Sequence, residues 1–221
     1  MVARVTGRVS RNERVNATRE SLLTAAERLF AERGVHAVGN RRISEAAGQG
    51  NNAAVTYHFG AKADLVRAIA RKHAERIERT RVRMVAEIGD SIVLRDWVAC
   101  LVRPVTEHLD GLGSPTWYAR FAAQAIADPA LHAIMIEESL AAAPSLGRFE
   151  DGLVRCLPEL PVEVHGERAA MARHLVVQMC VERERALAEG AATFRSTWND
   201  TADGLVDAIV ALWQTPVTTG H

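Results

Sequence analysis

Apolar residues recur at helical spacing along most of this 221-residue chain, and glycine or proline separates each such segment from the next. Leu22, Ala26 and Phe30, for example, fall on one face of a helix. No stretch alternates apolar and polar residues with the period of two that a half-buried strand shows. We therefore predict an all-α fold. We expect helices over residues 18–33, 40–47, 53–58, 62–87, 91–109, 115–127, 129–142, 146–156, 165–189 and 198–214.

Charge is distributed unevenly along the chain, although the formal net charge is zero. Residues 1–83 contain 17 Lys and Arg against 8 Asp and Glu, and the remaining residues contain 10 against 19. A basic first third indicates a part of the protein that approaches phosphates. Two solvated faces that differ in charge would also produce this pattern. Residues 1–15 are basic and poor in apolar residues, so we expect a flexible arm there.

Composition excludes several classes of protein. No apolar run approaches the ~20 residues that span a bilayer, and no apolar segment follows the basic N-terminus, as a secretory signal would require. The three cysteines Cys100, Cys156 and Cys180 stand far apart, which fits a reducing cytosol rather than a disulfide framework or a zinc cluster. We therefore expect a cytoplasmic protein without membrane contact.

Two short predicted helices, 40–47 and 53–58, are joined by the turn Gly48-Gln49-Gly50. A longer predicted helix precedes them and ends at Gly34, a residue suited to the position after a helix. Three helices within some 45 residues, two of them short and joined by a glycine-containing turn, are typical of a helix-turn-helix unit.

The order and spacing of three segments within residues 18–69 make the resemblance specific. AAERLFAERG lies on the first predicted helix, ISEAAG on the second, and YHFGAK runs from the third into the fourth. This region resembles the DNA-binding domain of the TetR family of transcriptional regulators. The resemblance implies a three-helix DNA-binding domain over residues 16–65, after the arm 1–15. It also implies a larger helical ligand-binding and dimerisation domain over residues 66–221.

The residues of the third predicted helix suit a helix that enters the major groove, because small and polar side chains allow close approach to base edges. Asparagine can pair with adenine, and alanine or the threonine methyl can contact a thymine methyl. Arg41 and Arg42 can reach phosphates or a guanine. The resemblance adds backbone contacts by Tyr57, His58 and Lys62. The predicted DNA contacts are therefore Arg41, Arg42, Asn51, Asn52, Ala53, Thr56, Tyr57, His58 and Lys62. Tyr57 and His58 would alternatively pack between helices.

Two features depart from the usual family pattern. The turn GQGNN is one residue longer than the common form, which puts the register of Asn51 and Asn52 in doubt. Ala61 stands where a serine often caps the next helix, so Gly60 is left as a weaker cap.

A ligand pocket is expected among the helices around residues 93–140, where apolar walls and a few polar anchors occur together. The candidate residues are Trp97, His108, Trp117, Arg120, Phe121, Gln124 and Met135, each of which would otherwise be ordinary core. The last two long helices are expected to form a homodimer interface through Leu175, Met179, Leu205, Ile209 and Trp213, unless their apolar stripes are core.

The sequence contains no HExxH, GxSxG, Walker loop or GxGxxG pattern, so we expect no enzyme, no metal site and no cofactor. The prediction is a homodimeric repressor that binds double-stranded, palindromic operator DNA and is released by a small-molecule effector. A non-specific DNA-binding protein and a helical small-molecule carrier remain as alternatives. Affinity independent of DNA sequence would identify the first, and a folded dimer without DNA affinity the second.

Overall fold

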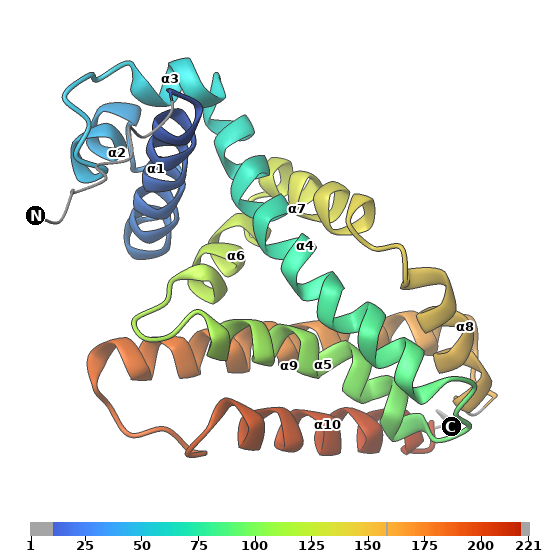
Figure 1. Cartoon of the computed structure of the whole chain (residues 1–221). Helices are drawn as coiled ribbons and strands as arrows, with labels where there is room; N and C mark the ends of the chain where they lie inside the picture. Colours follow the sequence, from blue (N-terminus) through green and yellow to red (C-terminus); the bar gives the residue numbers. More distant parts are fainter. Residues whose placement is uncertain (1–10, 158, 218–221) are drawn as a thin grey trace, which may run out of the picture.

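The computed structural model describes residues 11–157 and 159–217, and this part of the chain forms ten α-helices and no strand (Figure 1). The helices are α1 (Arg11–Arg33), α2 (Asn40–Ala46), α3 (Ala54–Phe59), α4 (Lys62–Ile88), α5 (Leu94–Gly111), α6 (Tyr118–Ile126), α7 (Pro129–Ala141), α8 (Leu146–Cys156), α9 (Val162–Glu189) and α10 (Trp198–Gln214). The predicted all-α fold is confirmed.

Local chemistry explains where several helices begin and end. Asp128 caps α7 because its side chain accepts hydrogen bonds from the N–H groups of Ala130 and Leu131. Thr197 caps α10 by accepting from the Asp200 N–H, while the Asp200 carboxylate accepts from the Thr197 N–H. Gly190 ends α9 with a left-handed conformation at φ 65°. These boundaries follow the glycine, proline and capping signals in the sequence.

The predicted N-terminal arm needs correction. Residues 1–10 of that arm lie outside the described residues, but residues 11–15 belong to α1. The predicted start of this helix at residue 18 therefore lies inside α1. The segment from Arg11 to Ala17 contains neither glycine nor proline, so its exposed side chains extend a helix that packing further along the chain already fixes.

Three structural regions follow one another in space (Figure 1). Helices α1–α3 form a compact end, α4 runs diagonally away from them, and α5, α9 and α10 form a layer at the other end. Helices α6 and α7 lie between these regions. No helix in the described part of the chain is both long and apolar enough to cross a membrane.

The hydrophobic core does not divide where the domains were expected to meet. One cluster joins Phe30 of α1 and Leu65 of α4 to Phe121 of α6 and Met135 of α7, all of them buried. A second cluster holds α5, α9 and α10 together, and Ile209 is fully buried in it. The expected boundary between residues 65 and 66 falls inside α4, so the two domains share a continuous helix and part of one core.

Candidate nucleic-acid interface

The turn between α2 and α3 is fixed by backbone hydrogen bonds. The Gly48 N–H donates to the Glu45 carbonyl at 3.1 Å, and the Gln49 N–H donates to the Ser44 carbonyl at 2.9 Å. Gly48 has φ 69°, a left-handed conformation that favours glycine. The tight turn that was predicted at Gly48-Gln49-Gly50 is therefore present, and it sets the direction in which α3 leaves α2.

Asn51 closes the next turn and so defines the register of α3. Its side-chain oxygen accepts from the Ala53 N–H at 2.9 Å, and its carbonyl accepts from the Ala54 N–H at 3.0 Å. Helix α3 consequently begins at Ala54, after Asn51, Asn52 and Ala53. Of the two neighbouring asparagines, Asn51 has its side-chain oxygen engaged in the turn, whereas the exposed Asn52 side chain has no hydrogen bond to a described residue.

The two faces of α3 differ sharply. Val55 is fully buried and Phe59 nearly so, and both belong to the core cluster. Tyr57 is 79% exposed, Thr56 is exposed and His58 is half-buried. Tyr57 therefore does not pack between helices, which removes for this residue the alternative left open by the sequence. The predicted contacts Asn52, Ala53, Thr56 and Tyr57 lie together on the exposed side of the α2–α3 unit.

Arg19 of α1 holds the C-terminal end of α3. One of its terminal nitrogens donates to the His58 carbonyl at 3.1 Å, and its guanidinium lies 4.3 Å from the centre of the Phe59 ring. This contact of Arg19 was not predicted from the sequence. Its contact with α3 joins residues 39 positions apart, and no local pattern reveals such a pairing.

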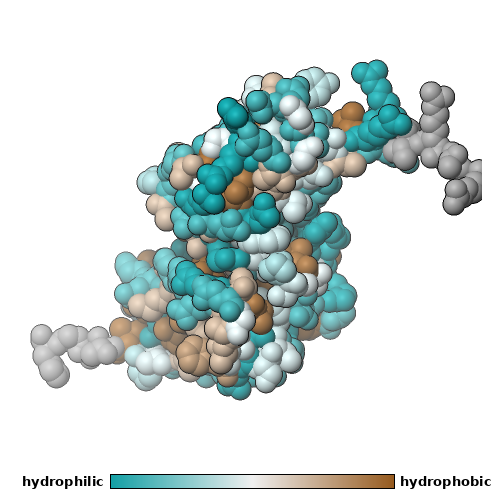
Figure 2. Space-filling model, turned by 90° about the vertical axis from the view of Figure 1, so that its left-hand side faces the viewer, coloured by the Kyte–Doolittle hydropathy of each residue, from teal (hydrophilic) through white to brown (hydrophobic). Residues whose placement is uncertain are grey.

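The predicted basic contacts are in three different situations. Arg42 is exposed, and no ion pair or hydrogen bond joins its side chain to a described residue. The Arg41 Nε atom lies 2.8 Å from the Glu45 carboxylate, which raises the pKa of Arg41. Lys62 is half-buried, and its Nζ donates to the Val35 carbonyl at 3.1 Å. Figure 2 shows a largely hydrophilic surface over the upper part of the molecule, with smaller hydrophobic patches between the polar side chains.

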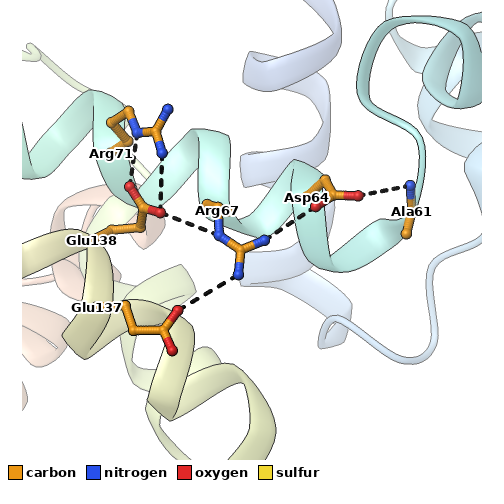
Figure 3. A network of polar contacts seen from close by, with 6 residues as sticks. All are labelled: Ala61, Asp64, Arg67, Arg71, Glu137 and Glu138. Carbon is orange, nitrogen blue, oxygen red and sulfur yellow. Dashed lines mark hydrogen bonds and ion pairs between the residues drawn. The ribbon is translucent and has the colours of Figure 1, made fainter. Parts of the chain in front are cut away.

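The N-terminus of α4 is capped from within the helix rather than by Gly60. Ala61 is the N-cap residue, and its N–H donates to the Asp64 carboxylate at 3.2 Å (Figure 3). Asp64 also accepts from Arg67 at 3.1 Å. Asp64 thus supplies the hydrogen bond to the N-cap N–H that a capping box has, and its charge complements the helix dipole, while Ala61 offers no side-chain acceptor.

Arginines of α4 continue this network to α7 (Figure 3). Arg67 contacts Glu138 at 3.2 Å and Glu137 at 3.6 Å. Arg71 binds the two carboxylate oxygens of Glu138 at 2.8 and 3.2 Å. Glu138 is buried, so two guanidinium groups compensate a carboxylate that has lost its water. The position of α7 is therefore tied to the half of α4 nearest α3.

A second polar network lies inside the molecule and joins four helices. The His73 Nε2 atom of α4 lies 2.8 Å from the Glu27 carboxylate of α1, and its Nδ1 atom lies 2.7 Å from His108 Nε2 of α5. The Tyr118 ring of α6 stacks on His73 with 3.8 Å between ring centres. Burial is the main cause that lowers the pKa of His108 to about 3, and positive neighbours add to the effect. His108 is therefore neutral at physiological pH.

The seven residues predicted for a ligand pocket do not line one cavity. Phe121 and Met135 are buried in the cluster with α1, whereas Trp97 is buried in another cluster with Phe149 and leaves no room for a side chain at Gly152. His108 is bound to His73, Gln124 is exposed, and Trp117 borders a surface groove.

Arg120, the remaining pocket residue, is committed to Glu184 of α9. The fully buried Glu184 carboxylate accepts from Thr116 Oγ1, the backbone N–H groups of Ala119 and Arg120, and Arg120 Nε, at 2.8 to 3.1 Å. These four donors satisfy the carboxylate and neutralise its charge. Glu184 also occupies the N-terminal end of α6, where the helix dipole favours an anion.

Three of the five predicted dimer residues are core residues, which corrects that prediction. Leu205, Ile209 and Trp213 are 4%, 0% and 2% exposed because their face of α10 packs inside the protomer. Met179 is partly buried against the same cluster. Leu175 remains on the surface, and Met171, one helical turn earlier on α9, is also exposed. The stripe on α10 is therefore used within one chain.

Comparison with known proteins adds an independent finding. Residues 22–69 match the family described as bacterial regulatory proteins, tetR family. The HTH-type transcriptional repressor AcnR of Corynebacterium diphtheriae is 35% identical over 88 residues, which are 40% of this chain and 44% of that protein. AcnR of Corynebacterium efficiens is 38% identical over 78 residues, or 35% of this chain and 39% of that protein. The chain thus spans less than half of the length of these relatives.

The fold as a whole has solved counterparts. A TetR family transcription regulator from Marinobacter aquaeolei has a TM-score of 0.59 at 15% identity, and the alignment covers 91% of this chain and 96% of the other. At this identity the likeness concerns the fold alone. The matched family and the named relatives are regulators rather than enzymes.

Proposed function

We propose that this chain is a transcriptional repressor of the tetR family, whose model matches residues 22–69, and that it binds operator DNA through α2 and α3. The observation that carries this proposal is the exposed side of the α2–α3 unit. Asn52, Ala53, Thr56 and Tyr57 project there without being needed for the core. Small and amide side chains on a helix outer face suit base edges in the major groove.

The basic residues around this surface would position the protein on the phosphates. Arg42 is exposed and unpaired among the described residues. Arg41 would bind a phosphate by breaking its ion pair with the exposed Glu45. The N-terminal end of α4 adds backbone N–H groups, which attract a phosphate together with the charge of Lys62. For Lys62 this role requires the Val35 hydrogen bond to be exchanged or shared.

A palindromic operator would follow from a symmetric dimer, because each recognition helix enters one of two major grooves about 34–36 Å apart. The exposed apolar residues Met171 and Leu175 of α9 support a dimer surface on that helix. We expect the wild-type protein to sediment as a dimer at micromolar concentration and Leu175→Glu to shift it toward monomer. A monomeric wild type would contradict the dimer.

Release by a small molecule completes the proposal. An effector would lower DNA affinity by binding better to a form in which the two recognition helices no longer match the operator spacing. Helix α4 connects α3 to α5 and α7, so a movement of those helices would reach the DNA-binding end through it. Such a regulator acts in the cytoplasm, where its operator lies.

The first test is fluorescence anisotropy of the purified protein on the DNA that flanks its own gene, with scrambled DNA as the control, near physiological salt. A specific repressor should prefer the flanking DNA by about 10³-fold or more. Equal affinity for both would contradict specific recognition of that DNA and favour a non-specific DNA-binding protein.

A further inference from the structure

A groove of about 410 Å³ lies where α1 and α2 approach the residue that precedes α6. Its lining includes Ser21, Thr24 and Arg28 of α1, Ala46 and Ala47 of α2, and Trp117. The volume falls within the roughly 300–1,000 Å³ of small-molecule sites. None of the residues predicted to contact DNA lines the groove.

Arg28 is the unusual residue in this groove. Its Nε atom is buried and has no hydrogen-bond partner, and no hydrogen bond or ion pair joins its side chain to another described residue. A buried donor without an acceptor costs free energy that a ligand oxygen would recover. Guanidinium groups bind carboxylates with two parallel hydrogen bonds, which makes a carboxylate the matching partner.

The charges around Arg28 also favour an anion. Glu20 is the acidic residue in the lining, and its carboxylate lies 2.7 Å from Lys72 Nζ, so its charge is already compensated. Arg28 therefore leaves the groove with an uncompensated positive charge. The hydroxyl groups of Ser21 and Thr24 offer further donors beside it.

The remaining walls are apolar. Ala46 and Ala47 are small, and Trp117 is a half-buried aromatic ring. We propose that this groove binds a small aromatic carboxylate, with the carboxylate on Arg28 and the ring against Trp117. Arg28 belongs to the DNA-binding end, whereas Trp117 precedes α6 of the other domain. An occupied groove would therefore link the two domains at a place that shares only Trp117 with the residues predicted for the effector pocket.

The test uses 2-naphthoate as the probe and 2-naphthamide, a neutral molecule of the same shape, as its control. Isothermal titration of the full chain without DNA should show about tenfold or greater preference for the carboxylate, since charge-assisted pairs are roughly twice as strong as neutral ones. Because no DNA is present, failure here would leave the proposed repressor function standing.

Two matched arginine variants locate the site. Arg28→Met should abolish the preference for 2-naphthoate, whereas Arg33→Met, on the exposed end of the same helix, should retain it. Thr24→Tyr changes an exposed position and should block both ligands by filling the groove. The proposal is overturned if wild type shows no binding up to about 5 mM, a range that covers weak millimolar sites. It is also overturned if both ligands bind equally, or if folded Arg28→Met or Thr24→Tyr binds like wild type.

Discussion

The α2–α3 unit and the region around Glu184 use polar side chains in opposite ways. On α3 the polar side chains point away from the core and leave most of their hydrogen-bonding capacity free. Around Glu184 four donors surround one carboxylate that is 1% exposed. Polar groups of the first kind are available to a partner, whereas those of the second kind are already committed to the fold. Polarity alone therefore does not identify a binding residue.

The largest effect on stability should come from removing the buried Glu184 carboxylate and its hydrogen bonds. Glu184→Ala leaves Arg120 partly buried without its partner and removes the acceptor for three other donors. We expect a loss of about 3–5 kcal/mol in the free energy of unfolding. Urea denaturation followed by circular dichroism measures it. Glu182→Ala, at an exposed position of the same helix, should change stability by less than about 0.5 kcal/mol. Equal effects of the two variants would show that the Glu184 network is not a stabilising unit.

Substitution of a side chain without a partner on the exposed side of the α2–α3 unit should change DNA binding rather than stability. Asn52→Ala should weaken operator binding by about 1–3 kcal/mol and leave the urea midpoint unchanged, because the Asn52 side chain has no partner in the described part of the protein. Asn51→Ala should instead lower stability by about 1 kcal/mol, since Asn51 accepts from the Ala53 N–H. Anisotropy and urea titration of both variants test the difference. A destabilised Asn52→Ala would contradict the assignment.

The smallest effect concerns pH and the buried His108. Its pKa is lowered to about 3 in the folded protein, so between that value and the unfolded value near 6.5 the unfolded chain binds a proton that the folded protein does not. Above pH 6.5, His108 is neutral in both states, and the full stability of the folded protein is present. As pH falls below that value, stability is lost because proton binding favours the unfolded chain. From pH 7 to 5.5 we expect a loss of about 1 kcal/mol.

His108→Gln should remove this part of the pH dependence, whereas His132→Gln, at an exposed position, should retain it. Urea midpoints of wild type and both variants at the two pH values make the comparison. An unchanged pH dependence in His108→Gln would mean that His108 is protonated as readily in the folded protein as in the unfolded chain.

The order of the helices could be predicted from the sequence because glycine, proline and capping residues act within a few positions. Gly34, Gly190 and Asp128 each mark a helix end in the sequence and in the structure. The α2–α3 turn and its exposed residues were predictable for the same reason. The start of α1 was not, because polar helix turns carry no apolar pattern.

Contacts between distant segments explain the remaining differences. A stripe such as Leu205, Ile209 and Trp213 shows that a face is covered, but not whether the covering surface belongs to the same chain. Likewise, Arg120 is a plausible ligand anchor until Glu184, 64 residues away, is found beside it. Which surfaces and charges pair depends on how the helices assemble, and helical spacing contains no such information.

The continuity of α4 has a consequence for exchanging parts between proteins of this fold. This helix has 27 residues and extends from the end of α3 to the region of α5 and α8. A single inserted residue would rotate everything beyond it by about 100° and advance it by about 1.5 Å. Placed between Arg71 and His73, it would turn Arg67 and Arg71 away from α7 and His73 away from Glu27. A chimera joined within α4 must therefore keep the number of residues in this helix, because that number sets both its helical phase and its length.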